Sequence, residues 1–130
     1  MGMTDWTESE LITAGYVLQN ALITRVDLTT LDHSCLTLEM TLEGQGFGVI
    51  YGGISLGRGY VGAKEFEGSA KGNEYIMRVM DTVGSDSFIG LEGKYVRVAI
   101  KDGKLAGAIC KIIGHIIEDK WFDPEKLFKE

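Results

Sequence analysis

The fold is decided by the alternation in residues 36–42, which read Leu-Thr-Leu-Glu-Met-Thr-Leu. Apolar side chains at the even positions and polar ones at the odd positions repeat every two residues, the period of a strand with one buried face. Residues 21–28 predict a partner strand before it, with a turn near residues 30–34. After a turn at residues 43–46, residues 47–56 predict a third strand. This part of the chain therefore predicts neighbouring strands of one sheet.

Glycine interrupts the third strand at Gly52 and Gly53. The whole chain holds 18 glycines and one proline, so several tight turns or close backbone approaches are expected. A pair of glycines inside a strand is typical of a bulge, or of a place where something approaches the backbone. We expect one of these at residues 52–53.

The period changes after residue 68. Apolar residues at helical spacing from Ser69 to Val83, followed by Gly84, predict one amphipathic helix that packs on the sheet. Residues 94–101 alternate again, Asp102-Gly103 is a hairpin signal, and residues 106–117 predict a long returning strand.

The whole chain is predicted to be one α+β domain, residues 1–130, with a mostly antiparallel sheet of about five strands and one principal amphipathic helix. Residues 1–20 are expected to form an N-terminal arm or a short helix. Residues 123–130 are expected to form a C-terminal helical turn, because Pro124 suits a first helical position.

The charge balance limits the classes of function. With 19 acidic and 13 basic residues, the net charge is −6, and a general nucleic-acid binder needs a basic surface. A local basic pocket for a small anion is still compatible with that charge. No run approaches the ~18 apolar residues of a membrane span. Cys35 and Cys110 are expected to be reduced thiols, which predicts a cytoplasmic protein.

Three patterns suggest chemistry and are weak. Residues 57–62 match G-x-G-x-x-G, but the residues that follow make a poor helix, which a dinucleotide site requires. A zinc site from His33, Cys35, Cys110 and His115 conflicts with the faces on which these residues fall in the predicted strands. A Cys35–His33 nucleophile and base would have no identifiable orienting acid. We therefore predict no metal, no cofactor and no catalytic residue.

Arg58 is the strongest candidate for a ligand contact, because neither neighbouring glycine shields its guanidinium, which can grip a phosphate bidentately. Tyr51 and Tyr60 would provide stacking faces, and Lys64 and Arg97 supporting charge. The alternative is that the glycines serve a bulged sheet and that Arg58 is a solvated turn residue.

Several stretches resemble a family of small phage and prophage accessory proteins of unknown function. They include residues 32–37, 51–53 and 56–60, residues 76–84 and 91–98, and most specifically residues 112–122, Ile-Ile-Gly-His-Ile-Ile-Glu-Asp-Lys-Trp-Phe. The resemblance runs from about residue 21 to residue 122, and Phe47 stands where members often carry Trp. It implies a phage or prophage origin and assigns no catalytic residue.

Two functions that follow from this resemblance stay open. The first is a non-enzymatic anti-defence protein in the host cytoplasm that sequesters a nucleotide immune signal. The alternative is a protein-binding inhibitor of a host defence complex, of the anti-CRISPR type, whose acidic surface would meet a basic partner. An enzyme, or a phage replication or structural helper, is less favoured. Trp6, Trp121 and Phe122 are further expected to form a self-association surface, giving a homo-oligomer, unless Trp121 and Phe122 close the core.

Overall fold

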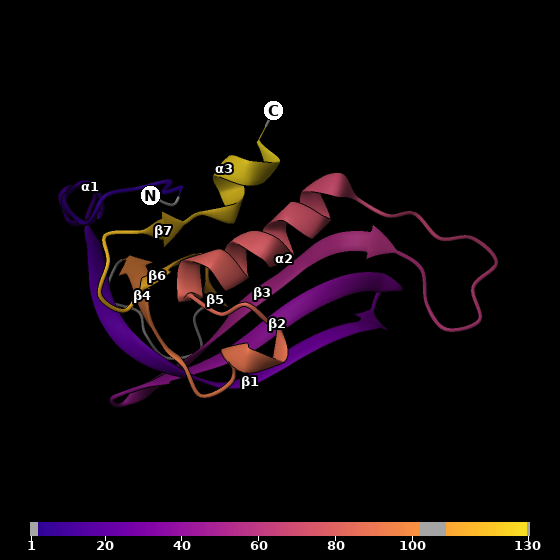
Figure 1. The fold of residues 1–130 in the computed structure, drawn as a ribbon, viewed down its shortest axis with the longest axis horizontal. Coiled ribbons are helices and arrows are strands. Elements are labelled where there is room, and N and C mark those ends of the chain that lie inside the picture. The colour runs from indigo at the N-terminus through magenta and orange to yellow at the C-terminus, as the bar shows by residue number, and fades with distance from the viewer. Residues whose placement is uncertain (1–2, 102–108, 130) are drawn as a thin grey trace.

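One curved sheet with a helix across its inner face forms the body of the protein (Figure 1). The computed structural model describes residues 3–101 and 109–129. Its elements are α1 (Glu8–Thr13), β1 (Tyr16–Asp32), β2 (Cys35–Gly44), β3 (Phe47–Arg58), α2 (Ala70–Val83), the 3-10 helix η1 (Ile89–Leu91), β4 (Tyr95–Lys101), β5 (Ile109–Cys110), β6 (Ile112–His115), β7 (Trp121–Phe122) and α3 (Pro124–Phe128).

The sheet has seven strands in the order β5-β3-β2-β1-β4-β6-β7. Its neighbouring strands pair antiparallel, except β3 and β5, which are parallel. The predicted α+β class, with a mostly antiparallel sheet and one principal helix, is therefore confirmed. The sheet has more than the expected five strands for two reasons. The predicted returning strand is divided into β5 and β6, and β7 adds a further strand of two residues.

Strand β1 is longer than predicted because it serves two partners. Its first half, Tyr16–Leu22, pairs with β4, and its second half pairs with β2. The predicted turn lies at His33 and Ser34, whose φ angles of 53° and 60° are those of a tight two-residue hairpin loop. One long strand thus joins both halves of the sheet.

The predicted bulge in β3 is confirmed. Gly52 and Gly53 have φ angles of 115° and 83°, and the register with β2 shifts beside them. A Cβ on Gly52 would collide with the Leu38 carbonyl oxygen, so the close approach of β2 requires glycine there. A Cβ on Gly53 would meet only the end of the Glu39 side chain.

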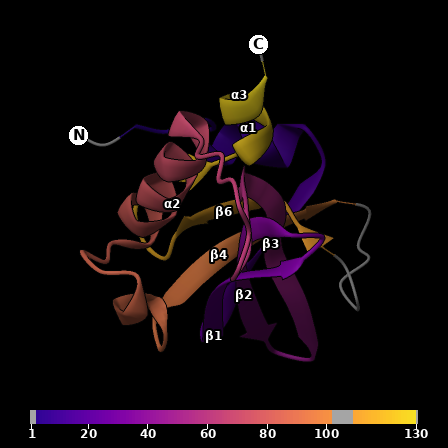
Figure 2. The same cartoon turned by 90° about the vertical axis from the view of Figure 1, so that its right-hand side faces the viewer.

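The predicted returning strand is wrong as one continuous element. Residues 102–108, with the predicted Asp102-Gly103 turn, lie outside the described residues. The rest breaks at Lys111: β5 pairs with β3, whereas β6 pairs with β4. The sheet curls so that β3 on one side and β4 on the other both come next to this segment (Figure 2). The segment changes its pairing partner from β3 to β4, and this change interrupts the strand.

Helix α2 confirms the predicted amphipathic helix. The Ser69 hydroxyl accepts a hydrogen bond from the Gly72 amide (3.0 Å), and Gly84 ends the helix with a φ of 92°. Tyr75 and Val79 are buried in the main core against the sheet. No helix in the described part of the chain is long and apolar enough to cross a membrane.

Both terminal segments form short helices. Thr7 and Glu10 form a capping box that begins α1, and β1 already begins at Tyr16, so the predicted arm joins the sheet. Asp123 caps α3, with Pro124 at its first position, as predicted.

Candidate functional site

Two arginines lie on opposite faces of β7, where the N-terminal and C-terminal segments pack together. Arg78 of α2 lies over the Phe122 ring, 4.6 Å from its centroid, and pairs with Asp5 at 3.1 Å. The Asp5 carboxylate also accepts a hydrogen bond from the Asp123 amide (2.8 Å). The buried guanidinium of Arg78 is therefore paired with groups of the protein itself and is not offered to a ligand.

Arg97 has the same structural role on the other face. Its guanidinium lies 4.6 Å from the centroid of the Trp121 ring and pairs with Glu8 at 3.1 Å. It also donates to the carbonyl oxygens of His115 and Glu118, each at 2.8 Å. Arg97, predicted as supporting charge for a ligand, instead holds β6, β7 and α1 together.

The residues of the predicted self-association surface are covered by other parts of the same chain. Trp121 and Phe122 have no exposed area, because the arginines and both cores cover them. Trp6 packs on the smaller core and donates a hydrogen bond from Nε1 to Asp123 (2.9 Å). Trp121 and Phe122 therefore close the core, which was the alternative considered from the sequence.

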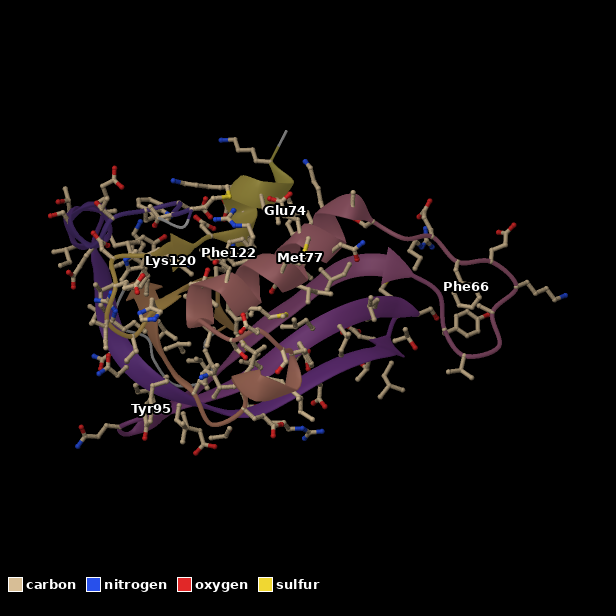
Figure 3. All side chains as sticks on the ribbon, in the orientation of Figure 1. Phe66, Glu74, Met77, Tyr95, Lys120 and Phe122 are labelled. Carbon is tan, nitrogen blue, oxygen red and sulfur yellow. The ribbon has the colours of Figure 1, made fainter. Side chains whose placement is uncertain are left out.

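Arg58, the strongest candidate predicted from the sequence, ends β3 at the point where the loop to α2 begins. The amides and carbonyls of Arg58 and Glu67 are hydrogen-bonded to each other (2.9 Å each), which closes the base of the loop. Gly59 donates to the Ser34 carbonyl oxygen (2.9 Å), tying the loop to the β1–β2 turn. The loop is therefore a projecting segment held firmly at its base (Figure 3).

A hollow of about 520 Å³, here called the loop hollow, lies between this loop, the end of β3 and the start of α2. Its lining includes Leu36, Leu56, Arg58, Tyr60, Phe66 and Asn73. The Phe66 ring rests on Gly59, where a Cβ would collide with it. A second, more polar hollow of about 680 Å³ shares Arg58, Tyr60, Phe66 and Glu67 with the first.

The structure brings only part of the predicted site together. Arg58 and Tyr60 both line the loop hollow, whereas Lys64 is exposed on the same loop. Tyr51 is 1% exposed and stacks on Tyr75, with ring centroids 6.2 Å apart, so it belongs to a different cavity. Arg97 lies at the opposite end of the sheet.

Charge in the loop hollow is balanced. Among the residues that the structure describes, none forms an ion pair with the Arg58 side chain, which is exposed. Glu67 lines the same hollow, and Glu65 lines the neighbouring one. The first turn of α2, whose dipole favours anions, carries no acidic residue. The arrangement can hold an anion of low charge beside an aromatic group.

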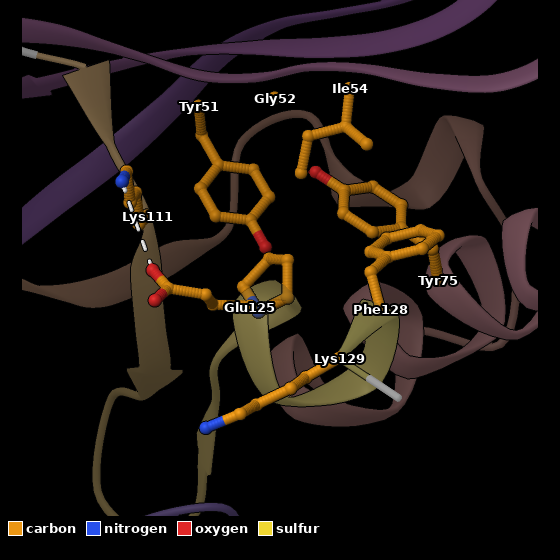
Figure 4. Close-up of a pocket in the computed structure, with 9 residues that line it drawn as sticks. Tyr51, Gly52, Ile54, Tyr75, Lys111, Glu125, Phe128 and Lys129 are labelled. Atoms are coloured by element: carbon orange, nitrogen blue, oxygen red, sulfur yellow. Dashed lines mark ion pairs between the residues drawn. The ribbon is translucent and has the colours of Figure 1, made fainter.

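A further cavity, here called the tyrosine pocket, was not predicted from the sequence. It measures about 630 Å³ and lies between β3, α2 and α3; its lining includes Tyr51, Ile54, Tyr75, Lys111, Glu125, Phe128 and Lys129 (Figure 4). The elements that build it are distant in sequence. The apolar Phe128 between Lys126 and Lys129 was the available signal.

The weaker motifs have structural positions. Residues 57–62 end β3 and enter the loop, and α2 begins only at Ala70, so no helix follows the glycines directly. His115 Nδ1 accepts the amides of Ile117 (3.0 Å) and Glu118 (2.9 Å), which organises the turn after β6. Within residues 3–101 and 109–129, no three His, Cys, Asp or Glu side chains are grouped to hold a metal ion.

Comparisons with protein-family models, with curated proteins and with solved structures give no match to this chain. The candidate function therefore depends on the geometry of the two cavities and on the surface charge.

Proposed function

We propose that this protein binds a small nucleotide-type ligand without transforming it, and that the loop hollow is its site. The observation that carries the proposal is the convergence of Arg58, Tyr60 and Phe66 on one hollow at the start of α2. A cation, exposed aromatic rings and a helix N-terminus are the groups that a phosphate-bearing planar ligand needs.

Each group has a specific part in binding. The base stacks on Tyr60 or Phe66, which are 50% and 72% exposed and so are open to a ligand. The phosphate lies against the Arg58 guanidinium, which can bond two of its oxygens. The Asn73 side chain, which also lines the hollow, offers an amide donor and an acceptor for the base or the sugar.

The local charge limits the ligand further. Arg58 is the cation of this hollow, and Glu67 beside it would repel a polyphosphate. Cyclic nucleotides and ADP-ribose derivatives carry few charges for their size and suit this balance better than a nucleoside triphosphate. Together with the resemblance to phage accessory proteins, this favours sequestration of a nucleotide immune signal as the biological role.

Calorimetric titration with cyclic dinucleotides, cyclic trinucleotides and ADP-ribose derivatives tests the proposal. We expect at least one of them to bind, and Arg58→Ala to weaken that binding by about 2–3 kcal/mol, since a hydrogen-bonded charge pair is lost. Arg25→Ala is the matched control, because Arg25 is an exposed arginine paired with Asp27 on a different part of the sheet. No heat and no rise in melting temperature with any of these compounds would refute the proposal.

A second candidate function is inhibition of a host defence protein with a basic surface. On the sheet, Asp27 and Glu39 are directly opposite each other on neighbouring strands, and Glu43 is exposed further along β2. Facing carboxylates repel, and Arg25, at 2.9 Å from Asp27, offsets part of this repulsion. If this surface is the functional one, reversing Glu39 and Glu43 to Lys abolishes binding to the partner, whereas Arg58→Ala has no effect.

A further inference from the structure

The tyrosine pocket combines an aromatic floor with charges at one side. Tyr51 and Tyr75 are each 1% exposed and form its floor, and the Phe128 ring lies 6.0 Å from that of Tyr75. Lys111, Glu125 and Lys129 line it as well, and Figure 4 shows the lysines and Glu125 away from the Tyr75 and Phe128 rings. The cavity is thus apolar at one part and carries one excess positive charge at another.

The charged side of the pocket is open to exchange. Lys111 and Glu125 approach only to 3.8 Å, and their side chains are 72% and 74% exposed. An ion pair this exposed contributes little to stability, so a ligand acid can replace Glu125 beside Lys111 at small cost. Lys129 is also exposed and supplies the second cation.

The volume and the lining residues of the tyrosine pocket indicate which kind of ligand fits it. About 630 Å³ lies within the range of pockets that enclose a small organic molecule. Ile54 and the three aromatic residues favour a flat apolar body, which gains from the removal of its surface from water. Multiply charged phosphates fit poorly, because the Glu125 carboxylate lies beside Lys111 and would repel them (Figure 4).

We infer that the tyrosine pocket binds a flat, apolar monoanion of the aromatic carboxylate or sulfonate class, with its rings against Ile54 and Phe128, over the buried Tyr75, and its acid group between Lys111 and Lys129. None of these residues lines the loop hollow, so this site is separate from the one proposed for a nucleotide. The failure of either proposal leaves the other intact.

Fluorescence titration with 8-anilino-1-naphthalenesulfonate tests this site, because that probe is a flat aromatic monoanion. We expect saturable binding of one probe per chain, and the double variant Lys111→Gln/Lys129→Gln to weaken it about tenfold through loss of charge pairing. The matched control Lys94→Gln/Lys101→Gln removes the same charge from exposed lysines elsewhere and is expected to change nothing. The neutral probe N-phenyl-1-naphthylamine is expected to bind equally to all three proteins.

Three results would overturn the inference. The first is the absence of saturable binding to the native protein up to about 1 mM probe, which would mean a dissociation constant weaker than about 1 mM. The second is equal weakening by both double variants, which would show a general charge effect. The third is loss of binding in Val61→Ser/Phe66→Ser, which would place the probe at the exposed loop, where these side chains are 96% and 72% exposed.

Discussion

The two ends of the molecule use arginine in opposite ways. Where the N-terminal and C-terminal segments pack together, Arg78 and Arg97 lie over Phe122 and Trp121, and each pairs with an acid of the N-terminal segment. At the projecting loop, Arg58 is exposed and lines the same hollow as Phe66, and Figure 3 shows Phe66 far from Phe122. A cation whose partners come from the chain itself stabilises the fold, whereas a cation left to solvent in a hollow is available to a ligand.

The largest expected effect tests the structural half of this comparison. Arg78→Ala leaves the Asp5 carboxylate, whose side chain is only 13% exposed, without its cation. We expect the free energy of unfolding in urea to fall by about 3–5 kcal/mol, the usual cost of breaking a buried ion pair. Arg25→Ala, which breaks an exposed pair with Asp27, is the control and should cost no more than about 0.5 kcal/mol. Equal losses would show that the Arg78 pair is not buried in solution.

A smaller effect compares the two ends directly. Arg97→Ala removes a charged donor from the carbonyl oxygens of His115 and Glu118, so we expect a loss of about 2–3 kcal/mol in unfolding free energy. Arg58→Ala should change stability by less than about 0.5 kcal/mol, because an exposed side chain without an ion pair is replaced. If Arg58→Ala destabilises as much as Arg97→Ala, Arg58 is a structural residue and the loop hollow loses its main support.

The smallest expected effect is a loss of stability at alkaline pH that is caused by ionisation of Tyr16. Burial raises the pKa of Tyr16 above its usual 10.0, and the negative charges of Asp123 and Glu125 raise it further. The native state therefore keeps the phenol proton longer than the unfolded state does. This stabilising contribution is complete below a pH of about 10 and is lost as the pH rises through the native pKa. Unfolding measured at rising alkaline pH should show a shallower loss of stability in Tyr16→Phe than in wild type; an identical loss would contradict this assignment.

Local patterns predicted most of the fold. The alternation of residues 36–42 and the helical spacing of residues 69–83 correspond to β2 and α2, because both depend on which face of a single element is buried. The bulge at Gly52 was also predictable, since the glycine pair interrupts a strand pattern. The break at Lys111 was not, because it arises from a change of pairing partner between β3 and β4, which lie far apart in sequence.

The site was only partly predictable, for the same reason. Arg58 and Tyr60 are two residues apart, and local reasoning placed them together. Arg97 has partners as distant as Glu8, and no pattern within one segment shows that they meet. Tyr51 was expected beside Arg58, but strand alternation turns it into the core, where it meets Tyr75.

The curled sheet also has a consequence for association between chains. Open strand edges act as templates on which other molecules assemble into fibrils. Here both outermost strands, β5 and β7, are two residues long, and the Asp5 amide already bonds Trp121. Along β3, the start of α2 packs on Leu56, and Glu67 pairs with Arg58. These outermost edges offer a second molecule little backbone to extend, whereas the edge of β1 beyond Leu22, where its pairing with β4 ends, is where an added strand would have to begin.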